Sequence, residues 1–197
     1  DTAAYDKFLG TAVIELVEAS QGHALMLFTS HAALRRVHKV VKPSLQMLGF
    51  DVLAQGIDGR PGQLLTIFRE SEKTLLLGTG TFWEGVDFAG DILQLLMMAR
   101  LPFRVPNDPI FSARSEMYQD AFNEMAIPES ILRFRQGFGR LIRTSRDHGA
   151  VVLFDNRLLT RPYGQLFLDA LPDTNIQMPS LVDLPDAVGG WIHGLTN

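Results

Sequence analysis

The fold is decided by residues 24 to 54, ALMLFTSHAALRRVHKVVKPSLQMLGFDVLA. Residues 24 to 28 form a fully apolar run of strand length, and residues 50 to 54 form a second short strand. Between them, residues 32 to 48 predict a helix that ends at Gly49, since glycine tolerates the backbone geometry that follows a helix. A strand, a helix and another strand in succession predict two parallel strands joined by a crossover helix.

The same alternation continues on both sides of this segment. We expect further helices over residues 6 to 20, 63 to 70, 110 to 126 and 161 to 170, and further strands over residues 74 to 77, 92 to 99 and 150 to 154. The run at 92 to 99 is rich in Leu and Met and would also suit a helix. The pattern predicts an α/β fold with a parallel sheet flanked by helices on both faces and functional loops at the carboxyl ends of the strands.

Composition limits the kind of protein. A chain of 197 residues that is 46% hydrophobic is long enough for one domain with a proper core, which we assign to residues 1 to 197. Residues 173 to 197 are rich in Pro, Asp and Gly and predict a peripheral closing segment anchored by Trp191. The net charge of -4 argues against nucleic-acid binding by bulk electrostatics, so any contact with a polyanion must be local.

Cysteine is absent, which excludes disulfides and cysteine-held zinc or iron–sulfur centres within these residues and fits a reducing cytoplasm. There is no apolar run long enough to span a membrane and no signal-peptide pattern, so we expect no membrane partner. The five histidines lack metal-ligand spacing, and we predict no metal site built by this chain alone. The chain starts at Asp1 without an initiator methionine, and we expect a fragment of a longer protein.

Residues 131 to 146, ILRFRQGFGRLIRTSR, predict a helix with two chemically opposite faces. At about 100° per residue, Gln136, Arg140 and Arg143 share a narrow sector. The apolar side chains lie on the far side: Ile131, Phe134, Phe138 and Leu141. The two guanidinium groups and the amide suit a polyanion such as a nucleoside triphosphate, although a solvated surface helix would show the same spacing. Gly137 and Gly139 favour the functional interpretation, because glycines inside a helix cost stability and indicate close approach of a backbone or a ligand.

Two strand-end segments carry further polar groups. Residues 78 to 90, GTGTFWEGVDFAG, follow a predicted strand, and their glycines leave room for backbone N–H groups to point at a phosphate; an ordinary strand-to-helix connection is the alternative. Thr29, Ser30 and His31 lie where a strand ends and a helix begins, and at least one of the two hydroxyls is expected to cap that helix. His31 has no Asp or Cys companion nearby, which favours a structural role.

Several motifs typical of nucleotide-binding proteins and hydrolases are missing from the sequence. The sequence has no phosphate-binding loop of the form G-x-x-x-x-G-K-[ST] and no Asp-Glu pair after a strand to hold Mg²⁺. Serine-nucleophile elbows and dinucleotide fingerprints are also absent. A nucleotide-facing arginine helix without its phosphate loop predicts half of a composite site, with the other half on another domain.

These segments together resemble a known family. TFWEGVDF (residues 81 to 88) and QGFGRLIRTSRDHGAVVLFDNR (residues 136 to 157) resemble motifs V and VI of superfamily 2 helicases of the DinG and XPD group. LPFRVPNDP (residues 101 to 109) is similar to the DinG side of that group, and LMLFTSH (residues 25 to 31) is similar to its motif IV. The resemblance covers most of the chain and implies a RecA-like fold, the second motor domain of a helicase.

The resemblance also implies roles for individual residues. Arg140 and Arg143 correspond to arginine fingers that act on the γ-phosphate across the interdomain cleft. The ATP side further includes Gln136, Gly139, Glu84, Gly85 and Asp87. The residues implied to face single-stranded DNA are Thr29, Ser30, Thr79, Gly80 and Thr81. His31 stands where relatives often have an aromatic residue, so the resemblance assigns it no role.

The resemblance implies an ATP-dependent DNA helicase or translocase, located in the bacterial cytoplasm and associated with the nucleoid. Its ATP and Mg²⁺ would be held mostly by a first RecA-like domain of the same parent chain, so this chain alone is predicted to be inactive as an ATP hydrolase. The alternative is a regulatory DNA-binding module that lacks an ATP cycle, or one in a DinG-type protein that is chiefly an exonuclease. An N-terminal exonuclease domain would then be a further partner.

Overall fold

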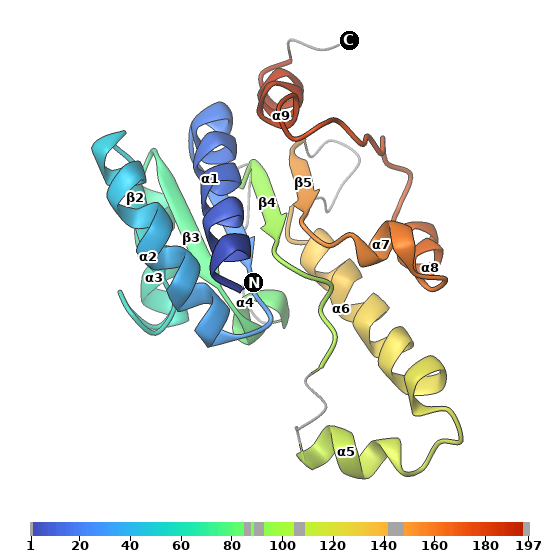
Figure 1. Cartoon of the computed structure of the whole chain (residues 1–197). Helices are drawn as coiled ribbons and strands as arrows, with labels where there is room; N and C mark the ends of the chain where they lie inside the picture. Colours follow the sequence, from blue (N-terminus) through green and yellow to red (C-terminus); the bar gives the residue numbers. More distant parts are fainter. Residues whose placement is uncertain (1, 85–87, 89–92, 105–108, 142–147, 195–197) are drawn as a thin grey trace.

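The apolar runs of the sequence form one parallel sheet (Figure 1). The computed structural model describes residues 2–84, 88, 93–104, 109–141 and 148–194. Within these residues the strands are β1 (Ala24–Leu27), β2 (Asp51–Ala54), β3 (Thr74–Gly78), β4 (Leu95–Met98) and β5 (Ala150–Leu153). Their order is β2-β3-β1-β4-β5, and every neighbouring pair is parallel. The strand predicted within residues 92 to 99 is confirmed for residues 95 to 98, which form β4.

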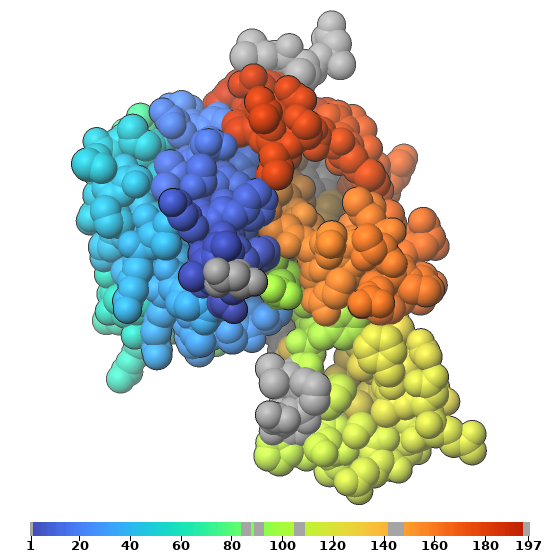
Figure 2. Space-filling view, in the orientation of Figure 1, coloured from blue at the N-terminus to red at the C-terminus, as the bar shows by residue number. Residues whose placement is uncertain are grey.

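Helices cover both faces of the sheet, as predicted. The described helical segments are α1 (Thr2–Ser20), α2 (His31–Met47), α3 (Pro61–Glu70), α4 (Gly80–Glu84), α5 (Pro109–Ser115), η1 (Phe122–Ala126), α6 (Ile127–Phe138), α7 (Arg157–Thr160), α8 (Gly164–Asp169) and α9 (Leu184–Ile192). Helices α1, α2 and α9 share one apolar core with the sheet, and α3, α4, α6 and α8 share the other. Figures 1 and 2 show α5 and the start of α6 extending away from this layered body.

Side-chain alternation along the strands separates the two cores. In β1, Ala24 and Met26 face the core under α1 and α2, whereas Leu25 and Leu27 face the core under α3 and α6. The strands β1, β3 and β4 are buried along their whole length. Burial on both faces explains why these strands are continuous apolar runs in the sequence rather than alternating ones.

Two predicted helices are interrupted. The helix expected over 110 to 126 is wrong for residues 116 to 120, because α5 ends at Ser115 and the side chain of Asp120 accepts a hydrogen bond from the Asn123 N–H, which starts a new helical segment. The helix expected over 161 to 170 begins only at Gly164. Residues 161 to 163 contain Pro162, which has no N–H to donate and therefore separates α7 from α8.

The C-terminal segment closes the face formed by α1. Helix α9 packs on α1, and Val188 is buried there. The Trp191 indole donates a hydrogen bond to the carbonyl of Gly149 at 2.9 Å and stacks on the His148 ring at a centroid distance of 4.9 Å. Trp191 thus links the end of α9 to the residues just before β5. Among the described residues, no helix combines the length and the apolarity needed to cross a membrane.

His38 makes the stability of this fold dependent on pH. Its side chain on α2 is buried, which lowers its pKa, and the charge of Lys42 lowers it further while Asp58, 3.6 Å away, opposes this. The unfolded chain therefore binds a proton at His38 at a higher pH than the folded chain does. The free energy of unfolding therefore keeps its full value above about pH 6.5 and decreases as the pH falls below that value.

We expect a lower urea midpoint at about pH 5.5 than at about pH 7.5. The difference should shrink in His38→Gln. It should persist in His193→Gln, a control that removes an exposed histidine whose ring nitrogen lies 3.1 Å from the Ala19 carbonyl oxygen. Equal pH dependence in wild type and His38→Gln would contradict the assignment.

Candidate functional site

A polar network joins the carboxyl ends of three strands. Gln55 follows β2, Thr79 follows β3, and His31 begins the helix after β1. The Thr79 N–H donates to Gln55 Oε1 at 2.7 Å, and the Thr79 hydroxyl donates to the same oxygen at 3.2 Å. The hydroxyl oxygen lies 3.1 Å from His31 Nε2, so that nitrogen donates to it. This arrangement fixes the tautomer of His31 and leaves its Nδ1 and the Gln55 amide nitrogen for other partners.

The structure places the residues assigned to DNA at this edge. They lie at the ends of the neighbouring strands β1 and β3: Thr29, Ser30, Thr79, Gly80 and Thr81. Thr29, Gly80 and Thr81 are exposed, whereas Thr79 is 4% exposed and acts through its two partners. Ser30 is the N-cap of α2 and its hydroxyl accepts from the Ala33 N–H at 3.2 Å, which confirms the capping prediction.

Gln55 was missed by sequence reasoning. The signal that could have found it is its position directly after a strand, the same position that drew attention to Thr29 and Thr79. Gly56 follows with a φ of 75°, a conformation that suits glycine and turns the chain back at this edge. Asp58 then accepts the Ala54 N–H at 2.9 Å and holds the turn.

The predicted helix over 131 to 146 is wrong for residues 139 to 141, and residues 142 to 146 lie outside the described residues. Helix α6 ends at Phe138, and Gly139 caps it with an N–H that donates to the Arg135 carbonyl at 2.8 Å. The next two residues continue as tight turns, with Arg140 donating to Gly137 and Leu141 to Phe138. Arg140 therefore does not share a helix face with Gln136, which is exposed on α6. The apolar face is confirmed, because Phe134, Phe138 and Leu141 are buried.

Contacts with Trp83 explain both the glycine at position 137 and the end of α6 at Phe138. A Cβ at Gly137 would lie 2.7 Å from the Trp83 ring, so glycine here admits a side chain rather than the backbone or ligand that was expected. The Arg140 guanidinium donates to the Trp83 carbonyl from Nη2 at 3.1 Å and from Nε at 3.3 Å. The Trp83 indole in turn donates to the Phe28 carbonyl at 3.0 Å. Arg140 is thereby tied to α4, and α4 to the end of β1.

The structure describes only some of the remaining predicted site residues. Glu84 is the last residue of α4, and Gly78 belongs to β3, so the first half of the glycine-containing loop is a strand-to-helix connection. Gly85, Asp87 and Arg143 lie outside the described residues. In the described part of the chain, no group of three or more His, Asp or Glu side chains is arranged to hold a metal ion.

A buried carboxylate ties the segment after β4 to the end of β5. Asp155 accepts from the Leu101 N–H at 2.9 Å and from the Arg157 guanidinium at 2.6 Å, with its side chain 4% exposed. Burial alone would raise the Asp155 pKa, but the hydrogen bonds from Arg157 and Leu101 outweigh it and hold the pKa below its usual value. The Arg157 guanidinium also lies over the Phe103 ring at 5.3 Å.

This geometry can be compared with known proteins. The family described as "Helicase C-terminal domain" matches residues 13–174. The chain belongs to this family, in the DinG and XPD-like group of superfamily 2 helicases. A "3'-5' exonuclease DinG" of Bacillus subtilis is 43% identical over 196 residues, which are 96% of this chain and 20% of that protein. An "ATP-dependent DNA helicase YoaA" of Escherichia coli is 42% identical over 161 residues, 80% of this chain and 25% of that protein.

A solved structure supports the helicase C-terminal domain fold. The chain described as "Structure of S. tokodaii Xpd4" superposes with a TM-score of 0.60 at 18% identity, covering 83% of this chain and 32% of that one. The likeness concerns the fold, which is a RecA-like α/β domain as predicted. Because the chain spans only a fifth to a quarter of the two relatives named above, their complete activities require parts that lie outside it.

Proposed function

We propose that this helicase C-terminal domain is the second motor domain of an ATP-dependent DNA helicase or translocase. ATP and Mg²⁺ would lie in a cleft against a first RecA-like domain of the same parent chain, which supplies the phosphate-binding loop that this sequence lacks. The proposal is supported by relatives named ATP-dependent DNA helicases from two bacteria.

In the proposed ATP site, Arg140 and Arg143 are the arginine fingers. An arginine finger stabilises the charge that develops on the transferring phosphoryl group, and its guanidinium must be held in place before closure. The observation that carries the proposal is the contact of Arg140 with the Trp83 carbonyl, since it holds one guanidinium against α4. The side of the cleft contributed by this chain is completed by Gln136, Gly139, Glu84, Gly85 and Asp87.

In the proposed DNA site, the single strand runs along the carboxyl edge of the sheet. Exposed Thr29 and Thr81 and the Gly80 backbone contact its phosphates, while the amide nitrogen of Gln55, held in place by Thr79, adds a side-chain donor. Most of these groups are neutral, so the contacts recognise the sugar–phosphate backbone without sequence preference.

Helix α4 provides the proposed link between the two sites. Its first residue, Gly80, belongs to the DNA edge, and its penultimate residue, Trp83, accepts hydrogen bonds from Arg140. Closure of the cleft on ATP would move Arg140 and α4 together, and with them the DNA contacts. Hydrolysis removes the γ-phosphate contacts and reopens the cleft, so that repeated cycles become stepping along the strand.

A second candidate function is favoured by one observation. The Bacillus subtilis relative carries the name of an exonuclease, so in a parent of that kind this domain would regulate a nuclease through DNA binding. Both candidates share the DNA edge and differ in whether Arg140 contributes to ATP hydrolysis.

The test uses the purified chain, fluorescent oligo(dT) and ATP. We expect oligo(dT) binding at about 50 mM sodium chloride that weakens only modestly by about 200 mM, because most of the contacting groups are neutral, and no ATP hydrolysis above background. Thr81→Glu should weaken binding about tenfold, because the added carboxylate repels phosphate. Thr66→Glu, which adds the same charge at an exposed threonine of α3, should have little effect.

Two results would overturn the proposal. Absence of oligo(dT) binding at low salt would refute the proposed DNA site. A clear ATPase rate from this chain alone, abolished by Arg143→Ala, would show that the site is not shared with a second domain.

A further inference from the structure

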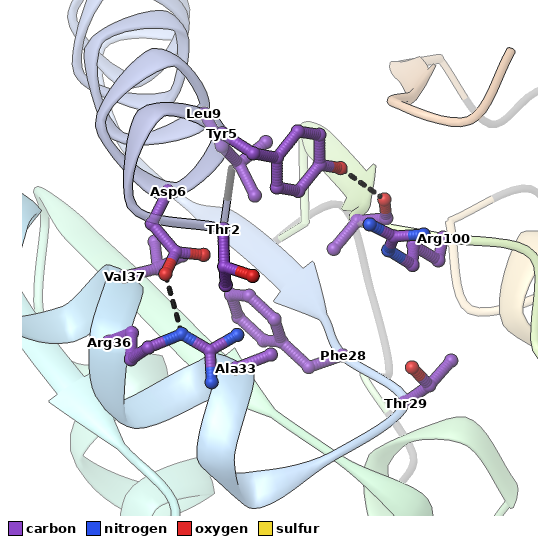
Figure 3. A pocket seen from close by; sticks show the side chains of 11 residues that line it. Thr2, Tyr5, Asp6, Leu9, Phe28, Thr29, Ala33, Arg36, Val37 and Arg100 are labelled. Carbon is purple, nitrogen blue, oxygen red and sulfur yellow. Dashed lines mark hydrogen bonds and ion pairs between the residues drawn. The ribbon is translucent and has the colours of Figure 1, made fainter. Parts of the chain in front are cut away.

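A cavity of about 280 Å³ opens beside the DNA edge (Figure 3). Its walls come from the start of α1, the residues after β1 and β4, and the first turns of α2. The lining residues that carry polar groups are Thr2, Tyr5, Asp6, Thr29, Arg36 and Arg100, and Phe28 contributes an apolar wall. Thr29 belongs both to this cavity and to the proposed DNA edge, so the two are continuous.

The position of the cavity follows from the topology of the sheet. The chain leaves β1 through α2, on one face, and leaves β4 through segments that lead to α6, on the other face. Adjacent parallel strands whose connections go to opposite faces leave a crevice outside their carboxyl ends, and ligands of open α/β sheets bind in such crevices. Phe28 and Thr29 after β1, and Ala99 and Arg100 after β4, line this crevice.

The charges in the cavity favour an anion. Figure 3 shows Arg36 and Arg100 on opposite sides of it. Asp6 neutralises one guanidinium through an ion pair with Arg36 Nε at 2.5 Å, which leaves the terminal nitrogens of Arg36 for other partners. Arg100 lies 5.0 Å from the centre of the Tyr5 ring, and its charge is not paired with a carboxylate in the described part of the chain. Two guanidinium groups and one carboxylate give the lining an excess of one positive charge.

The aromatic wall is held rigidly. The Tyr5 hydroxyl donates to the carbonyls of Ala99 at 3.1 Å and of Phe154 at 3.3 Å, which ties α1 to the ends of β4 and β5. Burial raises the Tyr5 pKa, and so the hydroxyl stays protonated and keeps donating. Arg100 therefore lies beside a ring that is held in place.

We propose that this cavity binds one nucleotide of the single strand, with a phosphate between Arg36 and Arg100 and the sugar or base beside the Tyr5 ring. This rests on the proposed function, because the strand reaches the cavity past Thr29. A volume of about 280 Å³ exceeds the needs of a lone phosphate ion and suits a small organic ligand. Guanidinium forks on two sides match the oxygens of a phosphodiester.

The test compares Arg100→Gln with a matched control, Arg35→Gln. Both changes remove one exposed guanidinium, and Arg35 lies beside Arg36 on α2 without lining the cavity. We expect Arg100→Gln to weaken oligo(dT) binding about tenfold and to lower the slope of log affinity against log salt by about one. Arg35→Gln should change affinity less than about twofold. Thermal melts of both variants confirm that the fold is kept.

A second measurement locates the ligand. Thymidine 3′,5′-bisphosphate should shift the backbone amide NMR signals of Ala33 and Val37, which line the cavity, in wild type and not in Arg100→Gln. Equal shifts with inorganic phosphate would overturn the nucleotide assignment in favour of a free phosphate site. Unchanged oligo(dT) binding in Arg100→Gln would overturn the inference and leave the proposed DNA edge standing. Failure of the wild type to bind oligo(dT) would instead overturn the proposed function itself.

Discussion

Replacement of Arg140 by alanine in a parent protein with both motor domains is expected to lower the DNA-stimulated ATPase kcat by about 10³- to 10⁵-fold, with little change in the KM for ATP. The reason is that an arginine finger acts on charge present only in the transition state. Single-turnover hydrolysis and nucleotide binding, measured separately, resolve the two quantities.

The control is Arg135→Ala, which removes an exposed arginine from the last turn of α6. Arg140→Lys separates charge from geometry, because lysine keeps the charge but cannot make the two hydrogen bonds to the Trp83 carbonyl. A purely structural role would lower the melting temperature and raise KM along with the loss of kcat. A decrease in kcat of less than about tenfold would refute the assignment of Arg140 as a finger.

Asp155→Ala is expected to lower the free energy of unfolding by about 3 kcal/mol, which is large for a single substitution. The change leaves the Leu101 N–H without its acceptor and removes the partner of Arg157, both in a largely buried setting. Urea unfolding of wild type and variant measures the difference. Asp173→Ala, at an exposed aspartate, should stay within about 0.5 kcal/mol of wild type.

The same carboxylate has a defined dependence on pH. Its folded pKa is depressed, so its contribution to stability is complete above the unfolded value of about 3.9 and is lost as the pH falls through the folded value. Asp155→Ala should therefore lose less stability than wild type on acidification. The double variant Asp155→Ala/Arg157→Ala tests whether the two residues are coupled. If its loss of stability equals the sum of the losses in the two single variants, the pair is not coupled.

Much of the fold could be predicted because its signals are local. Apolar runs such as residues 24 to 28 identify buried strands directly, and Gly49, with a φ of 81°, follows the end of α2 as expected. The predictions failed where a break depends on a single side chain, as at Asp120 and Pro162. Helical periodicity continues through such positions, because it registers the spacing of apolar residues and not the hydrogen bonds of one turn.

The candidate site was predicted less completely. The family motifs indicated Arg140 and the residues from Thr79 to Thr81 as candidates, but treating 131 to 146 as one helix gave Arg140 the wrong local geometry. The helix ends at Phe138 because Gly137 admits the Trp83 ring and the Arg140 side chain reaches the Trp83 carbonyl. Neither contact leaves a trace in the spacing of residues around 137.

By itself, the sequence determined the alternation of strands and helices, the faces that are buried and the absence of a phosphate-binding loop. Tertiary structure alone decided which strand ends meet, and so which polar groups act together. The hydrogen bonds of Thr79 with Gln55 and His31 span 24 and 48 residues, and that of Arg140 with Trp83 spans 57. Periodicity and capping act over a few residues, whereas these contacts depend on the strand order β2-β3-β1-β4-β5, which is set by packing of the whole sheet.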